Sequence, residues 1–304
     1  MQYSLKSTAV FQGKGLHSGA AVTLKIHPAP VGHGIWFLRS DVGAQDARIP
    51  AVWDAVVPSK LCTLIANDAG VSVSTIEHVM AALAGSAISN ALIEVDGPEV
   101  PILDGSAAPF VDGILTAGIL VQDAPVLAIR VLRAVEVRDG DAVARLEPSE
   151  MLEIDFRIDF AEAAIGQQSM VLNMANGAFV RELSNSRTFC RNADVIAMRE
   201  RGLALGGTLE NAVVFDGSNV LSPGGLRHAD EPVRHKMLDA MGDLALAGAP
   251  LLGRYTGVRA GHALTNKLLR ALFAQPDAWA YHNCEGHTGG KLPGVGVHRG
   301  DLPR

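Results

Sequence analysis

Strand patterns followed by helix patterns occur twice along this chain, and this order most narrows the folds that it can adopt. With 304 residues, the chain is long enough for one or two globular domains. In both halves a helix ends in small apolar residues before a glycine, Gly85 or Gly248, which supports an internal duplication only weakly. Strands are predicted at residues 21–27, 34–39, 91–95, 127–137, 151–159 and 211–215. Helices are predicted at residues 75–83, 104–118, 176–182, 194–201, 232–247 and 265–273.

Charge and cysteine content exclude several classes of protein. The formal net charge is -6 and the basic residues are spread along the chain, whereas a nucleic-acid-binding surface needs a concentrated basic patch. The cysteines, Cys62, Cys190 and Cys284, form no Cys-x-x-Cys pair and are typical of reduced thiols in the cytosol. The chain lacks a signal-peptide pattern and any run of ~20 apolar residues. We therefore expect a cytoplasmic protein without a transmembrane segment and without a nucleic-acid partner.

The helix predicted at residues 232–247 carries the strongest chemical signal. His235, Asp239 and Asp243 recur every four residues, so they lie along one face of that helix. An imidazole and a carboxylate at this spacing can both bind one zinc ion. The alternative is an exposed helix face with a hydrogen bond between His and Asp, and the pair alone does not decide between the two.

A third metal ligand and a base would have to come from elsewhere, and Glu77-His78 is the candidate pair. A catalytic zinc uses three protein ligands and needs a nearby base that takes a proton from water. The competing interpretation is a capping box over Ser74 to Glu77, in which Glu77 satisfies a backbone N–H and His78 is a hydrogen-bonded core residue. The residues alone leave both interpretations open.

Seven segments form a set that covers most of the chain. They are GKGLHSG (13–19), STIEHVMAALAG (74–85), PILDGSAAPFVD (101–112), SRTF (186–189), NAVVFD (211–216), VRHKMLDAMGDLALAG (233–248) and GHALTNKLL (261–269). In this order, over roughly residues 1–280, they resemble the UDP-3-O-acyl-N-acetylglucosamine deacetylases of lipid A biosynthesis. The combination of HKxxDxxGD with a distant EHxxxAL is highly specific for that family.

The resemblance implies a zinc-dependent hydrolase that removes the N-acetyl group of UDP-3-O-(3-hydroxyacyl)-N-acetylglucosamine. At matching positions, the zinc ligands would be His78, His235 and Asp239. Glu77 would be the general base that activates the attacking water. His262 would be a protonated imidazole that stabilises the oxyanion or protonates the leaving amine. The sequence does not choose between Glu77 alone and Glu77 with His262 as the carrier of the protons.

Other matching residues are implied to contact the oxyanion or the substrate. Thr188 would hydrogen-bond the tetrahedral oxyanion, and Asp243 would orient His262 and stabilise its charge. An amide resists attack, so zinc would both polarise its carbonyl and make hydroxide available near neutral pH. The implied substrate-binding residues are Lys236, His17, Phe189, Phe160, Arg259 and Leu61.

The fold implied by the resemblance is α+β, with two similar domains that each pack a layer of strands on helices and that enclose the active site between them. The domains would cover residues 1–124 and 125–281. A β-α-β insert at about residues 190–214 would line an apolar passage for the acyl chain. Residues 282–304, rich in Gly, Pro and His, are expected to form a flexible tail. The family implies a monomer from a Gram-negative bacterium.

Several residues depart from the family pattern in the nucleotide and acyl-passage regions. They leave the details of UDP contacts and acyl-chain preference in doubt, but not the reaction. The departures are Cys190 and Arg191 after the RTF motif, Ala142 after Asp141, Glu162 and Ala163 after an Asp-Phe strand end, and Arg259 before Ala-Gly-His.

Two other functions are compatible with part of this pattern. A nonenzymatic metal-binding or regulatory protein on the same fold is disfavoured, because a structural metal site requires neither an open position nor a base beside it. A zinc amidase for another N-acetylated sugar nucleotide is distinguished by the apolar insert, since only an acylated substrate needs an apolar passage.

Overall fold

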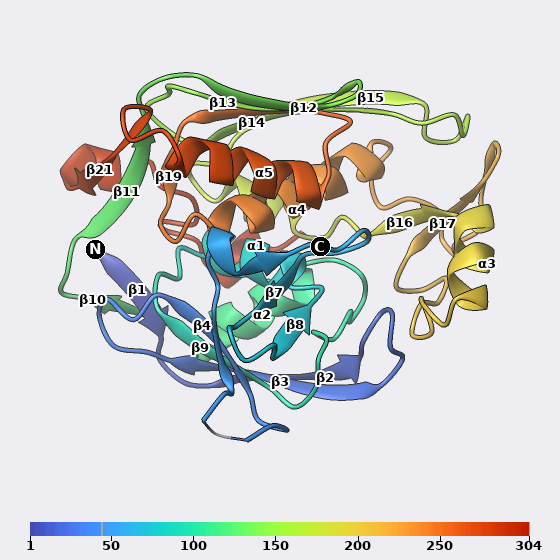
Figure 1. Ribbon diagram of the computed structural model, residues 1–304, viewed down its shortest axis with the longest axis horizontal. Coiled ribbons are helices and arrows are strands. Elements are labelled where there is room, and N and C mark those ends of the chain that lie inside the picture. Colours follow the sequence, from blue (N-terminus) through green and yellow to red (C-terminus); the bar gives the residue numbers. More distant parts are fainter. Residues whose placement is uncertain (44, 304) are drawn as a thin grey trace.

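A computed structural model describes residues 1–43 and 45–303 of the chain. Two large β-sheets lie on the outside, and two layers of helices meet between them (Figure 1). This arrangement confirms the predicted α+β class with two similar halves. The helices are α1 (Glu77–Gly85), α2 (Ala108–Ala117), α3 (Asn192–Glu200), α4 (Glu231–Ala245), α5 (His262–Phe273), α6 (Gly286–Gly289), a π-helical turn (Phe179–Leu183) and 3-10 turns at Trp53–Ala55 and Arg299–Asp301.

The described strands form two five-stranded sheets and four smaller ones. The first large sheet contains β2 (Ala9–Lys14), β3 (Ala21–Pro28), β4 (Ile35–Arg39), β5 (Arg48–Pro50) and β9 (Ala91–Val95). The second contains β12 (Val135–Asp139), β13 (Ala142–Glu147), β14 (Glu153–Asp159), β15 (Gln167–Asn173) and β20 (Arg254–Val258). The smaller sheets use β1 (Gln2–Leu5), β6 (Val56–Val57), β7 (Leu64–Ala66), β8 (Ser72–Ser74), β10 (Ile119–Gln122), β11 (Val126–Val131), β16 (Phe189–Arg191), β17 (Val213–Asp216), β18 (Asn219–Val220), β19 (Leu251–Leu252) and β21 (Trp279–Cys284).

The two large sheets share one topology. In the order β2-β3-β9-β4-β5, the central strand β9 is antiparallel to β3 and parallel to β4. In the order β12-β13-β20-β14-β15, β20 is likewise antiparallel to β13 and parallel to β14. One helix precedes each central strand in the sequence, α1 or α4, and another follows it, α2 or α5. This equivalence supports the internal duplication far better than the two helix endings do.

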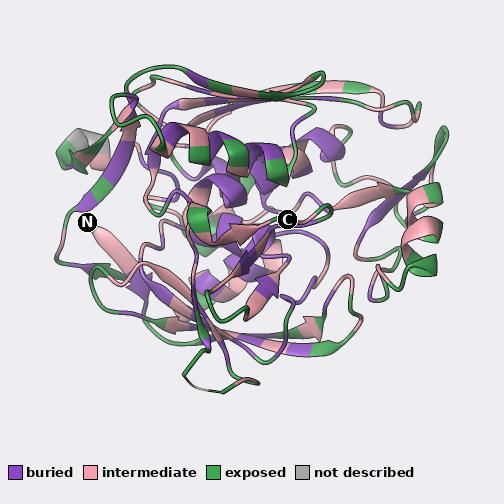
Figure 2. Cartoon of the chain, in the orientation of Figure 1, coloured by how far each residue is buried: buried purple, intermediate pink, exposed green. Residues whose placement is uncertain are grey.

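Alternating burial explains why the outer sheets pack on the helices. On β3, Val22, Leu24 and Ile26 are buried and point to one face, as the two-residue period of a strand requires. Buried residues concentrate in the helix layers and on the inner faces of the sheets, so a single large core joins the two halves (Figure 2). None of the helices in the described part of the chain combines the length and apolarity that a membrane crossing requires.

Each half carries an insert before its central helix. The inserts lie between β5 and α1 in the first half and between β15 and α4 in the second. The first insert is the small sheet β6-β7-β8, and the second contains β16, α3 and β17, with β16 and β17 parallel. The second is the predicted β-α-β insert, which projects from one edge of the molecule (Figure 1). Ile196 and Leu205 are exposed on it although they are apolar.

A glycine allows the two central helices to touch. A Cβ atom added at Gly242 on α4 would lie 2.0 Å from the backbone oxygen of Glu77 on α1. No side chain fits at that distance, so the backbones of the two helices are in direct contact there. This contact sets the spacing between the helix that carries His78 and the helix that carries His235.

Two expectations about the chain path are wrong. The single strand expected at residues 127–137 is two strands, β11 and β12, which belong to different sheets and are separated by an exposed Leu132. Residues 282–304 are not a free tail where they are described. β21 pairs along its length with β11, Leu292 is buried, and Arg299 donates two hydrogen bonds to Asp112. Outside the described part lie Arg304 and the side chains of residues 287 and 288.

Candidate active site

α1 and α4 bring three metal-ligating side chains together between the two halves. Nε2 of His78 lies 3.6 Å from Oδ1 of Asp239, and Nε2 of His235 lies 3.3 Å from the same oxygen. The two imidazole rings stand edge to face with their centroids 5.0 Å apart. One ligand atom from each of the three buried residues lies within 4.8 Å of the other two. Segments more than 150 positions apart in the sequence therefore meet as one potential metal site.

The protonation states of this group fit a divalent cation. Burial lowers the pKa of His235 to about 4, so its ring is neutral and able to act as a ligand. Burial alone would raise the pKa of Asp239, but His235 and Lys236 beside it lower that pKa well below its usual range. Oδ1 of Asp239 is buried and has no hydrogen-bond partner among the described residues. A buried carboxylate oxygen between two imidazole nitrogens is costly unless a cation binds there.

Glu77 faces this group and does not cap its helix. α1 begins at Glu77, its N-cap is Ile76, and no side chain caps it, so the capping-box interpretation is wrong. Oε2 of Glu77 accepts a hydrogen bond of 3.0 Å from the backbone N–H of Thr63, and Oε1 lies 3.8 Å from Nε2 of His262. Burial raises the pKa of the Glu77 carboxyl. A carboxylate with a raised pKa is a better proton acceptor near neutral pH.

His262 is the first residue of α5 and is held by Asp243 of α4. Nδ1 of His262 and Oδ2 of Asp243 are 2.8 Å apart, and Oδ1 of Asp243 accepts a 2.5 Å hydrogen bond from Oγ1 of Thr63. Burial alone would lower the pKa of His262, but the charges of Asp243 and Glu77 raise it to about 9. A base with a raised pKa thus faces an imidazolium, the pairing that separates proton acceptor from proton donor.

A small cavity of about 40 Å³ joins this group to other predicted site residues. The ring of His17 lines it, and both ring nitrogens are buried without a hydrogen-bond partner among the described residues. Burial lowers the pKa of His17, so the ring is neutral at neutral pH. The backbone N–H of Thr188 donates to the oxygen of Gly105, which holds Thr188 at the cavity wall. Besides the metal group, Glu77 and His262, the cavity is lined by Leu16, His17, Leu61, Cys62, Thr75, Ile102 and Thr188.

Four residues predicted to bind substrate lie beside the small cavity or away from it, but do not line it. The ring of Phe189 stands edge to face with those of Phe160 and His235, with ring centroids 5.4 and 6.3 Å apart. Nζ of Lys236 donates a 2.7 Å hydrogen bond to Oδ2 of Asp239, so its charge supports the metal group. Arg259 is not among the residues that line the small cavity; it pairs with Asp159 and Asp141 on the second sheet.

Two of the departures from the family pattern contact each other. Arg191 donates hydrogen bonds of 2.6 and 2.7 Å to Asp194 at the start of α3. Nη1 of Arg191 also lies 3.5 Å from Oε1 of Glu162, in the loop after β14. The pair therefore fastens the base of the β-α-β insert to the second sheet.

Two residues that support the site, Thr63 and Glu99, carry no recognisable signal in the sequence. Thr63 binds both Glu77 and Asp243 and follows Cys62 in an unremarkable loop before β7. Glu99 is buried and accepts hydrogen bonds from the backbone N–H groups of His17 and Ser18, which shapes the glycine-rich loop. Neither residue lies at a spacing that marks a motif.

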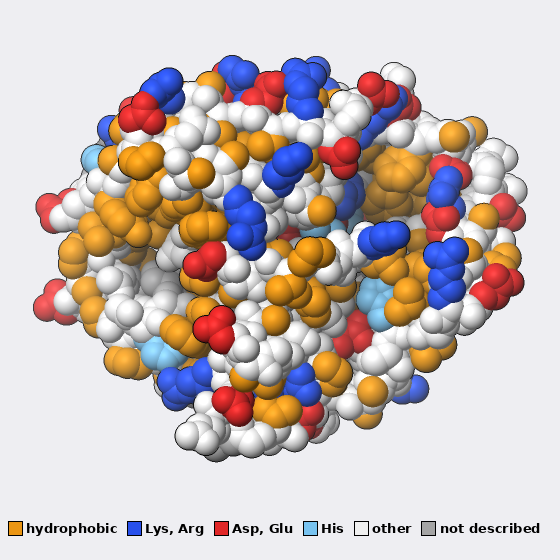
Figure 3. All heavy atoms as spheres, viewed as in Figure 1, with side chains coloured by type: hydrophobic (Ala, Val, Ile, Leu, Met, Phe, Trp, Pro, Cys, Tyr) orange, Lys and Arg blue, Asp and Glu red, His pale blue; other side chains and the backbone are white. Residues whose placement is uncertain are grey.

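A much larger cavity, of about 820 Å³, lies at the other ends of α1 and α4. Figure 3 shows a hollow with a largely hydrophobic rim on the side of β1 and β11. Its walls combine apolar helix residues with all three tryptophans of the chain and carry no second group of metal ligands within the described residues. Among the described residues, the one group of potential metal ligands therefore lines the small cavity. The lining residues used in this argument are Met80, Leu83, Met241, Leu244, Trp36, Trp53 and Trp279.

Comparison with known proteins agrees with this geometry. The family model described as "LpxC: UDP-3-O-acyl N-acetylglycosamine deacetylase" matches residues 2–274. A protein of Phenylobacterium zucineum (strain HLK1) is 51% identical over 278 residues, which cover 91% of this chain and 95% of that protein. Proteins of Shewanella sp. (strain W3-18-1) and Shewanella oneidensis are each 50% identical over 281 residues, covering 92% of this chain and 90% of theirs. All three are named UDP-3-O-acyl-N-acetylglucosamine deacetylase.

Proposed function

The chain belongs to the UDP-3-O-acyl-N-acetylglucosamine deacetylase family, and from this premise we propose that it hydrolyses the N-acetyl group of UDP-3-O-(3-hydroxyacyl)-N-acetylglucosamine. The products are the free amine and acetate, in the committed step of lipid A biosynthesis. The cofactor is a zinc ion held by His78, His235 and Asp239. The main support is Oδ1 of Asp239, which is buried, has no hydrogen-bond partner in the described part of the chain, and lies 3.3 and 3.6 Å from two imidazole nitrogens.

The residues around the metal group divide the remaining work. A zinc ion held by the three ligands would supply a Lewis acid for the amide carbonyl and for the attacking water near neutral pH. Glu77 takes the proton from the attacking water, which its raised pKa favours. The hydroxyl of Thr188 and the imidazolium of His262 stabilise the negative charge that develops on the carbonyl oxygen. Asp243 keeps His262 charged and oriented through their 2.8 Å hydrogen bond.

The leaving amine must receive a proton before the C–N bond breaks. His262 is the better donor, because its pKa of about 9 leaves it protonated at neutral pH without a preceding step. Glu77 is charged at the start of the cycle and could donate only the proton that it has taken from the attacking water. We therefore propose that Glu77 accepts and His262 donates. The proton held by Glu77 then passes to His262, whose Nε2 lies 3.8 Å from Oε1 of Glu77, and both groups return to their starting states.

The cellular setting follows from the substrate. A UDP-linked sugar supports a cytoplasmic location in a Gram-negative bacterium. One chain supplies the proposed ligands, the base and the acid, so a monomer is sufficient for catalysis.

The two domains meet at residues 124–125, since β10 closes the first half on β1 and β11 starts the second at Val126.

The rate of acetate release tests the proposed function directly. Purified protein is incubated with the acylated UDP-sugar, with and without a chelator that removes all zinc. We expect release to stop on chelation and to return when one equivalent of zinc is added, because zinc and the base act on the same water. Release that survives complete removal of zinc would overturn the mechanism. UDP-N-acetylglucosamine without the acyl chain is the matched substrate; equal turnover of both would favour an amidase of broader specificity.

The pH dependence of kcat/KM is expected to be bell-shaped. As the pH falls, Glu77 becomes protonated, and because burial raises its pKa this loss occurs above the usual range of a glutamate. As the pH rises, His262 loses its proton near its pKa of about 9. The profile is measured for the natural protein and for His262→Gln. The alkaline limb should disappear in the variant, and a limb that persists would belong to another group.

A further inference from the structure

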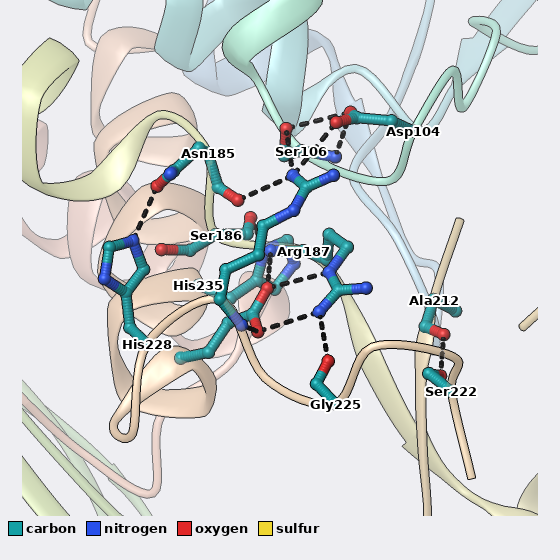
Figure 4. A network of polar contacts seen from close by, with 12 residues as sticks. Asp104, Ser106, Asn185, Ser186, Arg187, Ala212, Ser222, Gly225, His228 and His235 are labelled. Atoms are coloured by element: carbon teal, nitrogen blue, oxygen red, sulfur yellow. Dashed lines mark hydrogen bonds and ion pairs between the residues drawn. The ribbon is translucent and has the colours of Figure 1, made fainter. Parts of the chain in front are cut away.

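One peptide group links the first turn of α4 to the metal site. Its C=O, on Ser186, accepts a 3.0 Å hydrogen bond from Nδ1 of His235, and its N–H, on Arg187, donates a 2.9 Å hydrogen bond to Oε1 of Glu231 (Figure 4). A carbonyl oxygen can only accept, so Nδ1 of His235 carries the proton and Nε2 is left for the metal. Glu231 and His235 are one helical turn apart and therefore hold the two ends of the same planar unit.

The carboxylate of Glu231 is buried and fully occupied. Oε1 accepts from the backbone N–H and from Nε of Arg187, both at 2.9 Å. Oε2 accepts from Nη2 of Arg187 at 3.1 Å and from the backbone N–H of Arg227 at 2.7 Å. Burial alone would raise the pKa of Glu231, but these hydrogen bonds lower it, so the group is charged. Four donors around one anion leave it little freedom to move.

The segment on both sides of this peptide is anchored as well. Nη1 of Arg227 donates to the backbone oxygen of Asn185 at 2.8 Å and lies 3.0 Å from Oδ2 of Asp104 in the first half. On the other side of the peptide, Thr188 follows Arg187, and its backbone N–H donates a 2.8 Å hydrogen bond to the backbone oxygen of Gly105 in the first half. The peptide is therefore fixed against both halves of the molecule (Figure 4).

We propose that Glu231 is a positioning residue that orients the His235 ring, and raises its basicity toward the metal, through the Ser186–Arg187 peptide. The peptide is planar, so the hydrogen bond that fixes its N–H also fixes the direction of its C=O. The anion polarises the peptide, and the peptide in turn polarises the Nδ1–H bond of the imidazole. This is a carboxylate–histidine–metal arrangement with one peptide group inserted between carboxylate and ring. The inference rests on the proposed metal site.

The competing explanation is that the Glu231–Arg187 ion pair only stabilises the fold. A buried ion pair can do this without any effect on a metal ion. Metal affinity and the spectrum of a bound cobalt ion distinguish the two explanations, because they report on the ligands and not on overall stability.

The experiment measures the zinc Kd of the full chain by competition with a chelating dye, the visible spectrum of the cobalt-substituted protein, and the unfolding midpoint of the metal-free protein. Glu231→Gln places the amide NH₂ group, a donor, where Oε2 accepts hydrogen bonds from Arg187 and Arg227, so the hydrogen bonds at that oxygen are lost. We expect its zinc Kd to rise roughly 10–100-fold, the usual effect of losing a partner behind a metal ligand. The cobalt bands should shift and kcat should fall, with KM little changed.

Two variants serve as controls. Asp230→Asn removes the adjacent ion pair with Arg234, which does not touch the peptide, and should leave the zinc Kd and the cobalt spectrum unchanged. Arg187→Lys keeps the backbone N–H that binds Glu231. It should lower the unfolding midpoint but raise the zinc Kd less than Glu231→Gln does. If Glu231→Gln does not fold, Glu231→Asp replaces it in the test. Its side chain is one methylene shorter, so its carboxylate cannot reach the peptide and zinc binding should also weaken.

The outcomes separate the two proposals. A natural protein that fails to bind zinc would remove the proposed function itself. A natural protein that binds zinc, with a Glu231 variant that has the same Kd and the same cobalt spectrum and only a lower midpoint, would leave the proposed function intact and show that Glu231 is merely structural.

Discussion

Glu77→Ala is expected to lower kcat for acetate release by roughly 10²–10⁴-fold while zinc remains bound. The carboxylate faces the metal group from the first residue of α1, is buried, and has a raised pKa, so no other described group is as well placed to take the proton from water. Its contact with the backbone of Thr63 is a single hydrogen bond, and the helix has no side-chain cap to lose. Turnover and zinc content are measured on the same preparation.

Two further variants make this result specific. Glu77→Gln keeps an oxygen that accepts the hydrogen bond from Thr63, so an equal loss of turnover would assign the effect to the missing base. Glu94→Ala removes a partly exposed carboxylate that pairs with Lys25 and His27 on the first sheet, and it should leave kcat unchanged. Loss of zinc in Glu77→Gln, with turnover restored by excess metal, would instead show that Glu77 supports the ligands.

Gly242→Ala is expected to weaken both the fold and the metal site, although Gly242 is not a ligand. The added methyl group would lie 2.0 Å from the backbone oxygen of Glu77, so α1 and α4 must separate. Overpacking of this kind costs about 1–3 kcal/mol of the free energy of unfolding. The same movement separates His78 from His235 and Asp239 and so weakens zinc binding. Each ~1.4 kcal/mol of lost binding free energy raises the zinc Kd about tenfold. Denaturant unfolding and zinc competition measure the two effects.

Gly113→Ala is the matched control for that variant. A Cβ atom at Gly113 on α2 would meet the ring of Phe11, at 2.4 Å, so it also overpacks the core. α2 supplies none of the proposed site residues. We expect lower stability with an unchanged zinc Kd. An unchanged zinc Kd in Gly242→Ala as well would show that the helix contact does not set the ligand geometry.

The part of the site that depends on local periodicity could be predicted from the sequence. His235, Asp239 and Asp243 lie on one face of α4 because a helix returns to the same side after about four residues. Helix periodicity does not predict that α4 is buried on nearly all sides between the two halves. The convergence of these residues with His78 likewise depends on the Gly242 contact between two helices, which no local pattern contains.

Local sequence preference does not predict the structure where long-range contacts override it. The STIE sequence matches a capping box, yet Glu77 turns to Thr63 and the metal group, because that partner comes from the insert and not from the helix end. The segment after residue 281 has no apolar period, yet single residues such as Leu292 are buried against other parts of the chain. Glu231 looked like an ordinary acidic residue at a helix start, since its partners at Arg187 and Arg227 are distant or irregularly spaced.

The large apolar cavity has a consequence for optical measurements. Trp36, Trp53 and Trp279 are the complete set of tryptophans and all line its wall, while none lines the small cavity at the metal group. The intrinsic emission of the protein therefore reports on wetting and movement at the ends of α1 and α4 opposite the chemistry. An unchanged emission during turnover would therefore mean that the surroundings of these three tryptophans do not change.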